Sequence, residues 1–250
     1  MANKIFKARA SSLYEIMPDP KVKTNLISEG AITHLNNWVD MVYFNRKNEV
    51  KTFAMQKGTE CEIEALTIVK KYLNKPNLKK DNRHFEDEYL TGHIDIDNAG
   101  DDEIIDIKIC ETFSTFPRFK TKLEKAYEAQ MQAYMSLTGR NNAKVIKVLV
   151  NSPAWQIKSL INRVDYSLLN KYGETNEQHE AELNEAILSI FAQHVFDGNI
   201  QFDKYKLPEE MYIPIEQRIK VFEVKRDQEF IDKIPQKVLN CREFLKQNGY

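Results

Sequence analysis

The chain has 250 residues, 36 basic and 37 acidic side chains, and 42% hydrophobic residues. At this length roughly 75% of the unfolded surface is buried on folding, so no disulfide or metal is needed as a staple. Gly and Pro number 8 each, which excludes collagen-like, low-complexity and disordered chains. The formal net charge of −1 gives no overall support for nucleic-acid binding.

Membrane and secreted classes are also disfavoured. No apolar run approaches the roughly 20 residues of a membrane helix, and residues 1–17 lack the continuous apolar segment of a secretory signal. The cysteines are an odd, scattered set without a CxxC pair, which does not predict a disulfide framework. We therefore expect inert thiols in a reducing cytoplasm and no membrane partner. The three positions are Cys61, Cys110 and Cys241.

Charge is distributed unevenly along the chain. Residues 70–83 carry six basic side chains and one Asp, and residues 117–125 carry four basic side chains and one Glu. Residues 174–185 hold five Glu and no Lys or Arg. A balanced total can conceal a basic face. The two basic segments either follow a nucleic-acid backbone or form solvated surface.

The N-terminal part predicts helices. A short helix over 11–17 can be capped by Ser11 or Ser12, and Pro18 ends it. A second helical stretch covers 27–44. Its expected core contacts are Trp38, Val42 and Phe44.

A stronger helix is predicted to open at Gly58 and Thr59 and to end in the segment 74–77. Apolar residues recur along it at helical spacing, which predicts an amphipathic stripe. The stripe consists of Ile63, Leu66, Val69 and Leu73.

The segment 84–109 changes to strand periodicity. Alternating residues on both sides of the turn 98–102 predict a β-hairpin. Helical spacing returns over 123–137, where Gly139 is a natural C-terminal cap. The apolar, β-branched run 143–151 predicts a buried strand.

The C-terminal part predicts an acidic helix, a strand and a final helix with an internal proline. Because no repeat or clear linker interrupts the chain, we expect one domain, 1–250, of the α/β (α+β) class. Its core is expected over about 55–151, with 1–54 and 152–250 as additions. The C-terminal elements are 174–197, 218–224 and 226–247, with Pro235 inside the last.

The predicted hairpin brings acids and a lysine together. Asp106 and Lys108 share a face because alternate residues of a strand point the same way, and Asp95 or Asp97 can approach Asp106. Two close carboxylates repel unless a cation lies between them, and Mg²⁺ is commonly held by carboxylates plus substrate phosphates. Such an ion can activate water against a phosphodiester, while the lysine offsets transition-state charge. The alternative is a solvated hairpin face with a salt bridge.

Further candidates accompany these residues. Gly92 stands three positions before the first candidate ligand, and Gln130 and Tyr134 lie at i, i+4 on the following helix, where both can face one substrate. Glu62, in the first turn of the helix opened at the glycine, supplies another carboxylate. Glu60 is the alternative if the helical register differs.

In this order the elements resemble the PD-(D/E)xK nuclease superfamily, specifically its lambda-type (YqaJ-like) recombination exonucleases. The GxxD…DxK…QxxxY part is also similar to the nuclease domain of helicase-nucleases. The resemblance covers about residues 9–150 and implies a restriction-endonuclease-like core, a small mixed sheet flanked by helices. The matching segments are Gly58-x3-Glu62-x2-Ala65, Gly92-x2-Asp95, Asp106-x-Lys108 and Gln130-x3-Tyr134.

The resemblance implies a role for each residue. Lys108 is the catalytic lysine, and Gln130 and Tyr134 position the lysine, the water or the DNA. The metal is Mg²⁺, with Mn²⁺ as an alternative, and no iron–sulfur cluster is expected because relatives with one need four clustered cysteines. The implied metal ligands are Glu62, Asp95, Asp106 and the main-chain carbonyl of Ile107.

The implied activity is Mg²⁺-dependent exonuclease action on double-stranded DNA ends, 5′→3′, in phage-type recombination or repair. The resemblance also implies a homo-trimer, a single-strand annealing protein as partner, a bacterial or phage-infected cytoplasm, and a terminal 5′-phosphate held by Arg9 and Ser11. Alternatives are an endonuclease, a helicase-associated repair nuclease, and a non-catalytic module that keeps the fold. DNA capture is expected to weaken at high salt.

Overall fold

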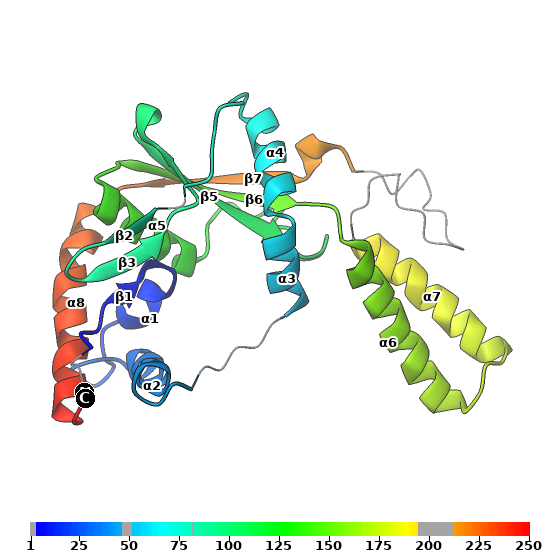
Figure 1. Ribbon diagram of the computed structural model, residues 1–250, viewed down its shortest axis with the longest axis horizontal. Coiled ribbons are helices and arrows are strands. Elements are labelled where there is room, and N and C mark those ends of the chain that lie inside the picture. The colour runs from blue at the N-terminus through cyan, green and yellow to red at the C-terminus, as the bar shows by residue number, and fades with distance from the viewer. Residues whose placement is uncertain (1–3, 47–51, 82, 195–212) are drawn as a thin grey trace.

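The computed structural model describes residues 4–46, 52–81, 83–194 and 213–250, which form two small sheets with helices around them (Figure 1). The strands are β1 (Ala8–Arg9), β2 (His84–Glu86), β3 (Leu90–His93), β4 (Ile96–Asn98), β5 (Glu103–Cys110), β6 (Asn142–Leu149) and β7 (Ile219–Lys225). The helices are α1 (Leu13–Ile16), α2 (Glu29–Tyr43), α3 (Phe53–Glu60), α4 (Glu62–Tyr72), α5 (Lys125–Thr138), α6 (Ala154–Tyr172), α7 (Glu177–Gln193) and α8 (Gln228–Gln247).

The larger sheet has the strand order β4-β5-β6-β7. β5 and β6 run parallel and are connected through α5, whereas β4 and β7 pair antiparallel with their neighbours. Alternate residues of β5 enter different hydrophobic cores: Ile104 packs on the side of α5, and Ile105 packs on the side of α4. The expected small mixed sheet flanked by helices is therefore confirmed.

The smaller sheet has the order β1-β3-β2. The single hairpin predicted over 84–109 is wrong in this respect, because the chain divides at Ile94 and Asp95 between two sheets. β3 pairs with β1 and β2, and only β4 pairs with β5. Ile94 is buried with the core around α5. The chain thus changes sheets immediately before the first candidate ligand.

The predicted helix from Gly58 is in fact two helices. α3 begins at Phe53, capped by the Thr52 side chain, and Gly58 lies in its interior. The helix breaks at Cys61, and α4 starts at Glu62. Ile63 lies on the opposite side of α4 from its buried residues and is 82% exposed, so the predicted stripe is wrong there. The buried residues of α4 are Ala65, Ile68 and Val69.

The remaining helices agree with expectation except for α6, which was not predicted. The expected cap of the first helix by Ser11 or Ser12 is wrong, because the Ser12 hydroxyl donates to the Arg9 carbonyl over 3.4 Å and caps no helical N–H. α6 and α7 run side by side as a hairpin away from the sheet (Figure 1), and the described part of the predicted helix 174–197 is α7. Phe44 is 56% exposed beyond the end of α2, so its expected core contact is wrong, whereas Trp38 packs against the core. Of the described helices, none combines the length and apolar character needed to cross a membrane.

Candidate active site

Strand pairing places Asp95 beside Asp106. Ile96 of β4 pairs with Ile105 of β5, so the next antiparallel position sets Asp95 opposite Asp106 on one face of the sheet. The Asp95 Oδ2 atom accepts a hydrogen bond of 3.0 Å from the main-chain N–H of Ile107. The carboxylate is thereby fixed to the backbone of the strand that carries the other candidates.

The buried Asp106 forms an ion pair with the partly exposed Lys108. The Lys108 Nζ lies 2.8 Å from Asp106 Oδ2, as expected for residues that share a strand face. Burial raises the pKa of the Asp106 carboxyl to about 6, against the effect of the Lys108 ammonium and with a further upward effect of Asp95. Burial alone lowers the pKa of Lys108, but attraction to Asp106 outweighs it and the net shift is upward. The lysine therefore keeps its proton.

Gln130 and Tyr134 form a buried hydrogen-bond chain from α5 to the site. The Gln130 Nε2 donates to the Tyr134 hydroxyl over 2.8 Å, and the hydroxyl donates to the main-chain carbonyl of His93 over 2.6 Å. Both side chains are buried, and neither lines the cavity described below; they are directed at one place in the backbone. That place is the segment just before Asp95.

Gly92 allows this close approach. A Cβ atom built there would lie 2.9 Å from Cε1 of the Tyr134 ring and 3.1 Å from the Cβ of Ala10. Only a residue without a side chain fits between these two groups.

A cavity of about 540 Å³ lies beside these residues. Asp95, Ile107 and Lys108 line one wall, and Glu62, paired with Lys80, lines it from α4. The cavity also has an apolar wall from α3 and α4. Its members are Ala54, Met55, Ile63, Ala65 and Leu66.

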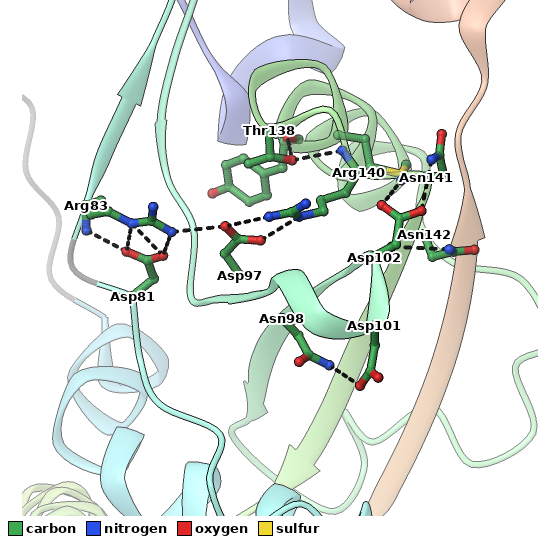
Figure 2. Close-up of polar contacts among 12 residues, drawn as sticks. Asp81, Arg83, Asp97, Asn98, Asp101, Asp102, Thr138, Arg140, Asn141 and Asn142 are labelled. Atoms are coloured by element: carbon green, nitrogen blue, oxygen red, sulfur yellow. Dashed lines mark hydrogen bonds and ion pairs between the residues drawn. The ribbon is translucent and has the colours of Figure 1, made fainter.

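Two of the alternative acids have other partners in the structure. Asp97 does not face Asp106. Its carboxylate accepts hydrogen bonds from Arg140 Nε at 2.8 Å and Arg83 Nη2 at 3.0 Å, which hold the pKa of Asp97 below its usual value (Figure 2). Glu60 accepts a bond of 2.6 Å from the indole N–H of Trp155 and lines a different cavity.

Tyr127 is a neighbour that the sequence did not single out. Its ring centroid lies 5.3 Å from Lys108 Nζ and 4.8 Å from Lys147 Nζ, and it lines the same cavity. Lys147 is the β6 residue paired with Lys108. The three-residue spacing of Tyr127 from Gln130 in the predicted helix was a signal in the sequence, whereas the register that pairs Lys147 with Lys108 is visible only in the fold.

The chemistry of the donors fits a hard divalent cation. Asp95 and Asp106 are two close carboxylates, and Ile107 adds a carbonyl between Asp106 and Lys108. Among the described residues, no three His, Cys, Asp or Glu side chains group closely enough to hold a metal by themselves. The structure therefore does not bring Glu62 together with Asp95 and Asp106, which the sequence had implied. Mg²⁺ does not require such a cage, since it is usually held by one or two carboxylates together with substrate phosphates.

Three solved structures are similar to this chain. A phage-related exonuclease from Haemophilus somnus 129PT is 25% identical, with a TM-score of 0.71 over 98% of this chain and 95% of that chain. The alkaline exonuclease LHK-Exo from Laribacter hongkongensis is 16% identical, with a TM-score of 0.53 over 97% and 92% of the two chains. LHK-Exo in complex with dAMP is 15% identical, with a TM-score of 0.55 over the same shares.

The protein has the fold of the lambda-type exonucleases. The prediction of a nuclease is thereby confirmed at the level of the enzyme class. No protein-family model and no curated protein matches the sequence. The roles of individual residues in this exonuclease fold remain predictions.

Proposed function

We propose that the protein is a divalent-metal-dependent exonuclease that hydrolyses phosphodiester bonds from the ends of double-stranded DNA. The main support for this proposal is that Asp95 lies next to the Asp106–Lys108 ion pair, beside the cavity. The similarity to a phage-related exonuclease favours exonuclease over endonuclease action.

The proposed metal is Mg²⁺, with Mn²⁺ as a substitute. Asp95, Asp106 and the Ile107 carbonyl are proposed to hold it, with Glu62 reaching it through water. When bound, such an ion polarises the phosphodiester and lowers the pKa of an attacking water.

The protein's own groups supply the remaining chemistry. Lys108 keeps its proton and lies at the cavity wall, where its ammonium can orient the attacking water and offset charge on the phosphate oxygens. Gln130 and Tyr134 act as positioning residues, since they hold the His93 carbonyl and with it the segment that carries Asp95. The apolar wall from α3 and α4 offers a surface for sugar and base.

The finer proposals concern direction and context. We propose 5′→3′ action in phage-type recombination or repair, in a bacterial or phage-infected cytoplasm, as a homo-trimer with a single-strand annealing protein. For the 5′-phosphate, β1 pairs with β3 so that Arg9 lies beside Thr91, one residue before Gly92. Arg9 and Ser11 are both exposed near this strand, which supports their proposed contact with a terminal phosphate.

Digestion of end-labelled linear duplex and of closed circular duplex tests the proposal. In Mg²⁺ we expect linear DNA to be degraded with early release of the 5′ label, and the closed circle to stay intact. No hydrolysis is expected in EDTA. Cleavage of the closed circle would establish an endonuclease instead, and undiminished cleavage in EDTA would refute the metal's role.

A further inference from the structure

The segment 117–122, between β5 and α5, exposes an aromatic ring among basic side chains. Phe119 is 90% exposed, and its neighbours Arg118, Lys120 and Lys122 are exposed as well. A phenylalanine in this position gives the fold almost no buried surface. The mechanism proposed above also assigns no role to this segment.

The segment is anchored from both sides. Phe113 and Phe116 pack with Cys110 and Leu149, and the Phe113 N–H donates to the carbonyl of Gln193 over 2.7 Å. After the segment, Leu123 is buried. The Arg118 guanidinium lies 4.2 Å from the Phe113 ring centroid. Phe119 is therefore presented outward by a fixed part of the chain.

A continuous series of contacts connects the segment to the candidate catalytic lysine. Lys120 lies 3.4 Å from Glu124 Oε1, which also pairs with Lys147 at 2.8 Å. Lys147 lies 4.8 Å and Lys108 5.3 Å from the centroid of the same Tyr127 ring. The segment that carries the exposed ring is thus linked through Lys120, Glu124 and Lys147 to Tyr127, which lines the cavity.

The charges identify the kind of partner. Within the part of the chain that the structure describes, neither Arg118 nor Lys122 forms an ion pair with a carboxylate, and only Lys120 does, with Glu124. Exposed cations around an exposed aromatic ring match the requirements of unpaired nucleic acid, whose bases stack on aromatic rings while its phosphates contact Lys and Arg. A paired duplex interior offers no free base face.

We propose that residues 117–122 bind unpaired DNA beside the catalytic cavity, with a base stacked on Phe119 and phosphates at Arg118 and Lys122. This inference rests on the proposed function, since it names where the same substrate is held outside the cavity.

Fluorescence anisotropy in EDTA, where no cleavage is expected, tests the inference with two labelled probes. One is a short oligothymidylate, and the other has abasic sites at the same positions and hence the same phosphates. The wild-type protein should bind the base-bearing probe with about fivefold or higher affinity than the abasic probe, which is the gain that one stacked base provides. Phe119→Ala should remove this preference and leave affinity for the abasic probe unchanged, whereas Phe119→Trp should retain it.

Two controls separate stacking from charge and from general surface effects. Tyr166→Ala removes another aromatic side chain, 69% exposed on α6, and should leave the preference intact. The double variant Arg118→Ala/Lys122→Ala should lower the affinity for both probes by the same factor and reduce the dependence of affinity on salt concentration.

Equal affinity of the natural chain for both probes, or an unchanged preference in Phe119→Ala, would overturn the inference. A fall in oligomeric mass of Phe119→Ala, measured by light scattering, without a change in probe preference would assign the ring to a second copy of this chain instead. The binding assay requires no hydrolysis. If the protein prefers the base-bearing probe but does not cleave DNA in Mg²⁺, only the proposed exonuclease activity is refuted. If it cleaves DNA but shows no preference between the probes, only the proposed binding of unpaired DNA at residues 117–122 is refuted.

Discussion

A methyl group added at Gly92 should disturb the candidate site without altering any residue that touches substrate. In Gly92→Ala the new Cβ would lie 2.9 Å from the Tyr134 ring and 3.1 Å from Ala10, so both neighbours must move. Tyr134 cannot move away freely, because its hydroxyl donates to the His93 carbonyl over 2.6 Å. The substitution therefore forces a choice between a clash and the loss of this hydrogen bond.

The cost follows from two opposing contributions. Overpacking of a buried position costs about 1–3 kcal/mol, while replacing glycine by alanine lowers the entropy of the unfolded chain and returns about 0.4–1 kcal/mol. The net loss of stability should be about 1–2 kcal/mol. For a chain of this size that lowers the melting temperature by about 2–8 °C.

Thermal and urea unfolding measure this loss, with Gly100→Ala as matched control, since a Cβ there meets nothing within 4 Å. Gly92→Ala should also reduce kcat, whereas the control should not. In a double-mutant cycle with Tyr134→Ala, the cost at position 92 should shrink because the ring that it strikes is gone. Equal stability of Gly92→Ala and Gly100→Ala would refute the proposed clash with Tyr134. So would an equal loss of stability from Gly92→Ala in the wild-type and Tyr134→Ala proteins.

Three further outcomes are expected. Lys108→Ala should abolish cleavage in Mg²⁺ but leave DNA binding in EDTA, and a fully active variant would contradict the proposed mechanism. Tyr134→Phe should cost about 1–3 kcal/mol in urea unfolding, because the buried amide of Gln130 and carbonyl of His93 both lose a partner; an unchanged midpoint would show that the chain of bonds is unimportant. Lys57 is 1% exposed, and burial lowers its pKa from 10.5 to about 8. Between these two pH values the unfolded state binds more protons, so stability relative to Lys57→Met should rise with pH, by up to about 3 kcal/mol, and a flat difference across pH 7–11 would show that this lysine titrates normally.

The pairing of Asp106 with Lys108 could be predicted from sequence because it depends only on the two-residue period of a strand. The identity of their partner could not. Asp95 and Asp97 share the same period, and the choice between them is made by Arg83 and Arg140, which bind Asp97 from distant parts of the chain.

The boundary between α3 and α4 likewise could not be predicted from the local sequence pattern. The run from Gly58 onward contains no proline or helix-ending glycine near Cys61, yet the helix breaks there. Cys61 is buried, and its thiol lies 3.7 Å from the carbonyl of Asn151, so the break coincides with a contact that is remote in sequence. The predicted stripe also placed Ile63 and Val69 on one face of the helix, although six residues turn a helix by about 240° and put the two on different sides.

Asp95 lies where the chain leaves the small sheet for the large one, and it is restrained two residues to either side. Tyr134 holds the carbonyl of His93 before it, and two arginines hold the side chain of Asp97 after it. A rotation of one sheet against the other would displace this carboxylate first. Under the proposed mechanism, substitutions of the tyrosine or the arginines are therefore expected to change turnover by shifting Asp95, without replacing any group that meets the scissile bond.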